Sequence, residues 1–156
     1  MSSIRVEVDP ELLDRLRGLE EADIAGAMAA AGEAIRTSTL ERFSREKDPE
    51  DRPWKKSIRA QRDGGKTLSA SRDLATSIHV ESSAKGVEVG TNKEYAAIHQ
   101  FGGTIRAKGG GLLRFKIGDQ WISKKSIKIP ARPYLGINEE DIREITHIIE
   151  EAVTGG

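Results

Sequence analysis

The feature that most constrains the fold is a run of apolar residues between positions 24 and 43 that recurs every three or four residues. This spacing places the apolar side chains on one face of an α-helix, and that face must be covered by the rest of the chain. The run comprises Ile24, Ala27, Met28, Ala31, Ala34, Ile35 and Phe43. Its small alanines permit close packing, so we expect the fold to be built around one long N-terminal helix.

Short segments with strand-like alternation lie on both sides of this helix. Residues Ile4–Val8 alternate apolar and polar side chains, and Asp9-Pro10 then predicts a helix cap followed by proline at the first helical position. Residues 77–81 and 87–90 predict two strands joined by a turn at 84–86. The sequence therefore combines helices with short strands.

The C-terminal part of the chain predicts a hairpin and a helix. Strands at 112–117 and 121–129 follow the stretch 108–111, which is too rich in glycine to be rigid without a partner. Pro130–Pro133 stops the second strand, and Asn138 predicts the cap of a last amphipathic helix. We therefore expect an α+β fold in which a small mixed or antiparallel sheet packs against a long N-terminal helix and a C-terminal helix, with a long flexible β-hairpin. Residues 1–156 are expected to form a single domain.

Three connecting segments complete this prediction. Residues 48–53 and 59–66 predict exposed connections, and Trp54 is expected to anchor the chain between them. Residues 94–101 predict a short helix that Gly102-Gly103 ends, because glycine tolerates the left-handed conformation found at helix C-termini.

The charges of the chain are balanced in total but divided by segment. Residues 1–51 carry 7 basic and 13 acidic side chains, residues 52–133 carry 17 and 6, and residues 134–156 carry 1 and 6. Within the basic middle, residues 103–133 hold eight basic side chains and one acidic side chain, Asp119. Such a division can attract nucleic acid or the acidic end of another copy, although an evenly solvated surface explains it equally well.

The inventory of reactive groups argues against an enzyme. The chain has no cysteine, and His79, His99 and His147 lack the local spacing of metal ligands. We therefore expect no metal site. Gly109–Gly111 lacks the pattern of a phosphate-binding loop, so no nucleotide cofactor is expected either. A hydrolase using His99 and Glu94 would have no nucleophile motif beside them. No apolar run is long enough to span a bilayer, and we expect no membrane partner.

Two segments carry a more specific signal. The first, residues 89–105, reads Val-Gly-Thr-Asn-Lys-Glu-Tyr-Ala-Ala-Ile-His-Gln-Phe-Gly-Gly-Thr-Ile, and the second, residues 129–136, reads Ile-Pro-Ala-Arg-Pro-Tyr-Leu-Gly. Together they resemble the phage virion morphogenesis family of contractile-tailed phages and Mu-like prophages. The likeness covers most of the chain. One departure is Ser71-Arg72, where the family pattern usually has threonine and glycine.

The resemblance implies a structural virion protein that acts in tail completion and head–tail joining, as a subunit of a ring at the neck or tail end. Its expected partners are other tail or neck proteins and further copies of itself, with DNA passing through the lumen of the ring. The free subunit is expected to stay monomeric until it meets the tail. The expected location is the virion, after assembly in the host cytoplasm, and no catalytic residues come with the resemblance.

The residues expected to contact other subunits or partners come from these segments and the basic hairpin. They are Tyr95, His99, Gln100, Phe101, Gly102, Gly103, Arg106, Lys108, Arg114, Lys116, Trp121, Lys124, Lys125, Arg132 and Tyr134. Tyr95, Ile98 and Phe101 could equally bury the short helix. For His99, a buried hydrogen-bonded histidine and an interface residue remain open alternatives.

The alternative function is a nucleic-acid-binding module formed by the basic 103–133 hairpin. In that reading the basic side chains neutralise phosphates and Trp121 stacks on a base. The phosphate-binding residues would be Lys108, Arg114, Lys116, Lys124, Lys125 and Lys128.

Overall fold

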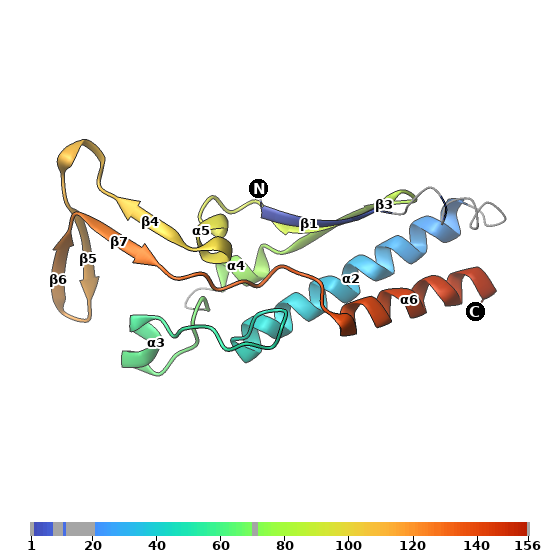
Figure 1. Ribbon diagram of the computed structural model, residues 1–156, viewed down its shortest axis with the longest axis horizontal. Helices are drawn as coiled ribbons and strands as arrows, with labels where there is room; N and C mark the ends of the chain where they lie inside the picture. Colours follow the sequence, from blue (N-terminus) through green and yellow to red (C-terminus); the bar gives the residue numbers. More distant parts are fainter. Residues whose placement is uncertain (1, 8–10, 12–20, 70–71, 156) are drawn as a thin grey trace.

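The helix expected from the apolar spacing is α2, Glu21–Arg45, which runs along much of the length of the molecule (Figure 1). The computed structural model describes residues 2–7, 11, 21–69 and 72–155, so the helix start expected at Asp9-Pro10 lies outside the described residues. Met28, Ala31 and Ile35 are buried on the predicted apolar face. The spacing therefore identified the side of α2 that faces the core.

A three-stranded antiparallel sheet covers one side of α2. Its strands are β1 (Ser2–Glu7), β2 (His79–Ser83) and β3 (Gly86–Thr91), in the order β1-β3-β2. In the β1–β3 pairing, Ile4 lies opposite Val89 and Val6 opposite Val87, and all four belong to the core or pack against it. The polar residues that alternate with them face solvent, as the period of a half-buried strand requires.

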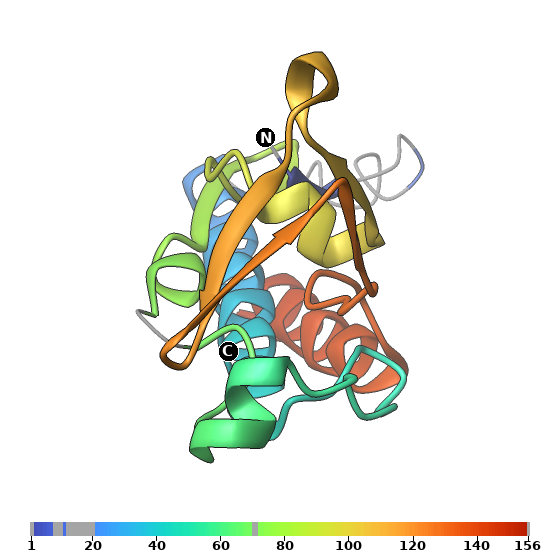
Figure 2. The ribbon, with the colours of Figure 1, turned by 90° about the vertical axis from the view of Figure 1, so that its left-hand side faces the viewer.

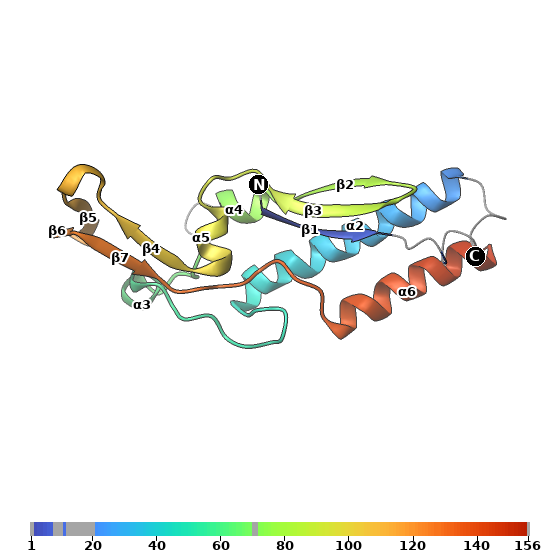
Figure 3. The same ribbon diagram turned by 45° about the horizontal axis from the view of Figure 1, so that its top comes forward.

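Helix α6 (Glu139–Thr154) packs beside α2 (Figures 1 and 3). Its start is the one expected, because Asn138 caps the helix and forms a reciprocal capping box with Asp141. The α+β fold, with small antiparallel sheets, a long N-terminal helix and a C-terminal helix, is confirmed. Helix α2 lies between the three-stranded sheet and α6 (Figure 3). Within the described part of the chain, no helix is long and apolar enough to cross a lipid bilayer.

The hairpin differs from the prediction. The strand expected at 121–129 is wrong as a single strand, since it divides into β6 (Gln120–Lys124) and β7 (Ser126–Ile129). Strand β6 pairs with β5 (Leu113–Ile117), whereas β7 pairs with β4 (Gly103–Arg106), a strand that the sequence did not predict. The carbonyl of Lys125 accepts a hydrogen bond from the Ala107 amide at 3.1 Å, so the chain turns between the two ribbons there.

These two ribbons form one end of the molecule, which Figure 2 views end on. We call β4 to β7 together the arm. The glycine-rich stretch before β5 contains a short 3-10 turn, Lys108–Gly110. Alternation within 121–129 shows a strand-like backbone but carries no information about which partner each half pairs with, which is why one long strand was expected.

The connections also contain more structure than expected. The connection expected at 59–66 is wrong in part, because α3 (Ile58–Asp63) forms there. Ser57 caps this helix by accepting a hydrogen bond from the Ala60 amide at 3.1 Å, and Gly64 ends it at a φ of 76°. A further short helix that the sequence did not predict is α4 (Asp73–Thr76), whereas the short helix expected at 94–101 is confirmed as α5 (Ala96–Phe101).

Trp54 is the buried anchor that the sequence indicated. Its ring meets Phe43 of α2 edge-on, with the centroids 5.5 Å apart, and its Nε1 donates to the Pro133 carbonyl at 2.8 Å. The indole thereby fixes the chain before α3 against the segment that leads to α6.

Candidate assembly surface

The two segments that carry the family resemblance lie side by side. Residues 130–136, which we call the crossing segment, connect β7 to α6 and pass next to α5 (Figure 1). Gln100 of α5 joins them with three hydrogen bonds. Its Oε1 accepts from the amides of Tyr134 and Leu135 at 3.1 and 3.0 Å, and its Nε2 donates to the Leu135 carbonyl at 2.9 Å. One amide side chain thus makes three hydrogen bonds between two segments that lie far apart in the sequence.

Tyr134 is the centre of this contact and is fully buried. Its hydroxyl donates to the Ala96 carbonyl at 3.0 Å, and its ring lies 5.2 Å from that of Phe43. Burial, with a smaller contribution from Tyr95, raises the pKa of Tyr134 to about 12, so the hydroxyl stays protonated and able to donate. In the isolated chain Tyr134 is therefore part of the core.

Arg132 also holds the crossing segment in place. Its amide donates to the His99 carbonyl at 2.7 Å, and its Nε donates to the Lys55 carbonyl at 2.6 Å. The side chain is buried, which lowers the pKa of the guanidinium. Because both contacts are to backbone carbonyls, Arg132 ties the chain before α3 and helix α5 to the crossing segment.

Gly102 explains why the helix of the first segment ends in glycine. Its φ is 71°, and a Cβ at this position would lie 2.7 Å from the Ala131 nitrogen and 3.0 Å from the Ile129 carbonyl oxygen. A side chain would therefore be strained by the backbone conformation and would also collide with the crossing segment. The helix end and the start of β4 can pass the crossing segment only with glycine at this position.

His99 lies partly buried at the edge of this contact. Its ring is 6.0 Å from that of Tyr95 and nearly perpendicular to it, and its Nδ1 is buried without a hydrogen-bond partner among the described residues. Burial lowers the pKa of His99, and the positive charge of Arg132 lowers it further. The structure thus favours a neutral His99 in a partly apolar setting. One of the two alternatives for His99 was a buried, hydrogen-bonded histidine, and the hydrogen bond expected for it is not found at Nδ1 among the described residues.

The other expected contact residues divide between the body and the arm. Phe101 is 75% exposed, next to the glycine pair, and Tyr95 is partly exposed on the same helix. The remaining residues lie on the arm, and all have exposed side chains: Arg106, Lys108, Arg114, Lys116, Trp121, Lys124 and Lys125. The fold therefore brings Tyr95, His99 and Gln100 together with Arg132 and Tyr134, and leaves the arm residues apart from them.

The outer ribbon of the arm has two different faces. Leu113, Phe115 and Ile122 are partly buried on one face, where Phe115 pairs with Ile122 across the strands. The opposite face carries Arg114 and Trp121, and the Arg114 guanidinium lies 5.7 Å from the centroid of the indole ring. This second face is cationic and aromatic, as the sequence indicated.

Sequence reasoning missed an ion pair that fixes α6. Arg42 donates to Asp141 at 2.6 Å, and both side chains are only 6% exposed. The signal was present, because Arg42 follows Ile35 and Thr39 at helical spacing on the buried face of α2. A charged residue at a core position requires a buried partner, which the acidic start of α6 supplies.

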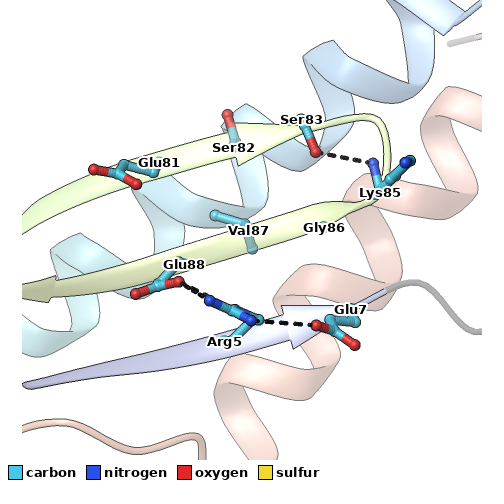
Figure 4. A pocket seen from close by; sticks show the side chains of 9 residues that line it. All are labelled: Arg5, Glu7, Glu81, Ser82, Ser83, Lys85, Gly86, Val87 and Glu88. Carbon is cyan, nitrogen blue, oxygen red and sulfur yellow. Dashed lines mark hydrogen bonds and ion pairs between the residues drawn. The ribbon is translucent and has the colours of Figure 1, made fainter.

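A hollow of about 600 Å³ lies on the outer face of the three-stranded sheet (Figure 4). Arg5 of β1 spans it, with its guanidinium 2.7 Å from Glu88 and 3.7 Å from Glu7. Ser3 donates a further hydrogen bond to Glu88 at 2.7 Å. The hydrogen bonds from Ser3 and Arg5 lower the pKa of Glu88, so these side chains form a solvated charge ladder across the strands.

The described residues contain no cluster of three or more histidine, aspartate or glutamate side chains that could hold a metal ion. Glu94, the carboxylate considered beside His99, is exposed to solvent. The described residues form a body from which a cationic arm projects (Figure 1).

Comparisons with known proteins agree with the family resemblance of these two segments. The sequence profile of the phage virion morphogenesis family matches residues 7–154. The chain belongs to the phage virion morphogenesis family. It is 31% identical over 140 residues to the "Putative capsid assembly protein G" of Escherichia phage Mu, covering 84% of this chain and 78% of that protein. It is 35% identical over 98 residues to the Mu-like prophage FluMu G protein 2 of Haemophilus influenzae, covering 63% and 57% respectively. No solved structure matches.

Membership confirms the resemblance read from residues 89–105 and 129–136. Membership in this family makes the chain a phage protein with a role in virion structure or assembly. In this family member, the residues that carry the resemblance are largely those that pack α5 against the crossing segment.

Proposed function

We propose that the protein completes the phage tail and joins it to the head, as one subunit of a ring at the neck or tail end. The observation that carries this proposal is the arm, which projects from the body at one end of the molecule (Figures 1 and 2). Its ribbons pack mainly on themselves, and two-stranded ribbons have little stability of their own. A partner surface would supply the contacts that the arm lacks.

The charge division supports assembly through subunit contacts. The arm and the segment before α3 are rich in basic side chains, whereas α6 has five exposed glutamates and one exposed arginine. These regions occupy different parts of the elongated molecule (Figure 1). Copies can thus associate side by side, with acidic helix against basic surface, while the arm orders on a neighbouring tail or neck protein.

The test is to add the purified protein to tails from a mutant phage that lacks it, and to measure its mass in solution before and after mixing. Electron microscopy of the mixture should show new density at the head-proximal end of the tails, and joining to filled heads should be restored. Absence of both association and rescue would overturn the proposal.

A matched variant sharpens this test. Replacing residues 107–125 by a short glycine-containing turn would close β4 directly onto β7, whose pairing from Gly103–Ile129 to Arg106–Ser126 lies outside the deletion. The body should fold, as its far-ultraviolet circular dichroism would show, but tail rescue should be lost. Full rescue by the folded deletion variant would show that the outer ribbon is not the docking element.

Nucleic-acid binding is a second candidate because Trp121 is 63% exposed beside Arg114 and Lys116 on one face of the outer ribbon. Aromatic stacking together with cations is how proteins hold single strands without sequence preference. Binding to random DNA that weakens steeply with added salt, and that Trp121→Ala reduces, would support this function. No binding at low salt would remove it.

A further inference from the structure

A groove of about 840 Å³ lies beside the two segments that carry the family resemblance, and Tyr95, His99 and Arg132 of these segments help to line it. It is bordered by the residues that lead into α3, by α5 and by β7. Its apolar lining includes Ile58, which is 60% exposed, and Tyr95, which is 43% exposed. Single exposed apolar side chains are common on protein surfaces, but apolar side chains gathered in one patch with a polar rim are typical of a site that binds a partner.

The rim of the groove is strongly cationic. Its basic residues are Lys55, Lys56, Arg59, Lys128 and Arg132, against one carboxylate, Asp73, which has a contact of its own. Arg59 and Arg132 donate to backbone carbonyls. Lys55 and Lys128 are exposed and form no ion pair with any residue that the structure describes. The occupant should therefore offer both apolar side chains and carboxylates.

Helix α6 carries such a surface on its solvent side. The exposed residues Glu139, Ile142, Thr146, Glu150 and Val153 follow one another at intervals of three or four, so they form one continuous stripe. Ile142 is 54% exposed and Val153 is 47% exposed, although the apolar face of the helix is already packed on α2. At 1.5 Å per residue the stripe is about 21 Å long.

We propose that the groove binds the α6 stripe of a second copy of this chain. Glu139 and Glu150 would lie over Lys55 and Lys128, while Ile142 and Val153 would cover Ile58 and Tyr95. The contact must be between copies, because within one chain α6 packs along α2, away from α3 and β7 (Figures 1 and 3). The role of this contact in building a ring rests on the proposed function.

This contact joins two different surfaces of the chain, so it is heterologous. Each copy would offer one groove and one stripe, and repetition of the contact would generate a closed ring or an open filament instead of a two-fold dimer. The pairing follows the helix-in-groove mode, in which apolar anchors at helical spacing supply affinity and flanking charges fix the orientation.

The test uses charge reversal in two separate variants. K55E/K128E reverses the groove, and E139K/E150K reverses the stripe. Each variant alone should associate at least about tenfold more weakly than the wild type in sedimentation experiments, because like charges then face each other. An equimolar mixture should regain wild-type association, since every groove then meets a stripe of opposite charge in strict alternation.

Matched controls separate this contact from a general effect of charge. E140K/E151K reverses two exposed glutamates on the other edge of the same helix, and R45E/K85E reverses two exposed basic residues outside the groove. Both should associate like the wild type, and all variants should keep the wild-type circular dichroism. A comparable loss in either control, or no recovery in the mixture, would overturn the proposal.

Disulfide trapping keeps the test decisive if association is weak. The chain has no cysteine, so a K128C copy mixed with an E150C copy can form only disulfides that involve these positions. The mixture should yield a linked heterodimer several times more abundant than a mixture of K85C with E150C. Equal yields would overturn the contact. If this contact were overturned but the wild type still restored deficient tails, the proposed function would stand without the contact. If the contact were confirmed but the wild type did not restore the tails, only the proposed function would be overturned.

Discussion

Arg42 of α2 and Asp141 of α6 form an ion pair inside the protein, with Nη2 and Oδ2 2.6 Å apart. The same guanidinium donates to the carbonyls of Tyr134 and Gly136, at 3.0 and 2.9 Å. Asp141 also accepts the Asn138 amide at 3.1 Å, which is half of the capping box of α6. One pair of side chains therefore fixes where α6 begins and how it lies on α2.

Asp141→Ala should destabilise the protein strongly. It would leave the buried Arg42 without its counter-charge and remove the capping box, so we expect the free energy of unfolding to fall by about 3–5 kcal/mol. Urea denaturation followed by tryptophan fluorescence measures this loss. Glu50→Ala is the control, since it removes an exposed ion pair with Arg52 and should leave the urea midpoint almost unchanged. Similar losses in both variants would contradict the structural role of the buried pair.

Gln100→Leu should weaken the contact between α5 and the crossing segment. The substitution keeps the approximate volume but removes three hydrogen bonds to the backbone of residues 134 and 135. We expect a loss of about 1–3 kcal/mol in the free energy of unfolding, because these backbone groups would be left without partners. Gln61→Leu serves for comparison, because Gln61 is exposed and makes one long hydrogen bond of 3.3 Å. Equal stability of the two variants would show that the Gln100 contacts are not needed.

The sequence predicted the elements of the body better than the contacts between them. Apolar spacing identified α2 and its buried face, and the Asn138 cap located the start of α6. The residues expected at an interface include Gln100, Arg132 and Tyr134, which the fold uses to join α5 to the crossing segment. Local patterns identify such residues as unusual but cannot distinguish contacts within the chain from contacts between chains.

The arm shows a second limit of sequence reasoning. The alternation in 121–129 correctly indicated extended backbone, but it could not show that Lys125 separates strands with different partners. Strand pairing is a long-range property, and β4 is too short and too exposed to have a pattern of its own. The groove was likewise hidden, because its lining comes from four separate parts of the chain.

Arg72→Gly should stabilise the protein, although it removes a side chain. Arg72 has a φ of 60°, a left-handed conformation that is unfavourable for residues with a Cβ and that glycine adopts freely. The family pattern has glycine at this place. After the greater flexibility of glycine in the unfolded chain is counted, we expect a gain of about 0.5–1 kcal/mol. Lys85→Gly, at a position without positive φ, should instead lower the melting temperature.

Gly32→Ala and Gly26→Ala should have opposite effects within the same helix. A Cβ on Gly32 would lie 2.4 Å from Val80 Cγ1 and 2.6 Å from Val87 Cγ2, so α2 would be pushed from the sheet. We expect a loss of about 1–3 kcal/mol. Gly26 has nothing within 4 Å of its Cβ position, and alanine there should add about 0.5–1 kcal/mol through helix propensity. Thermal unfolding of both variants tests the closeness of this packing.

His99 should make the protein less stable as the pH falls. Burial, and then the charge of Arg132, lower its pKa in the folded state below the value of about 6.5 expected in the unfolded chain. Below that value the unfolded chain takes up the proton first, so the contribution of neutral His99 is complete above pH 6.5 and is lost as the pH drops towards the folded pKa. Urea midpoints measured from pH 7 to pH 5 should therefore decline less for His99→Gln than for the wild type. A parallel decline in both proteins would assign the acid sensitivity to other groups.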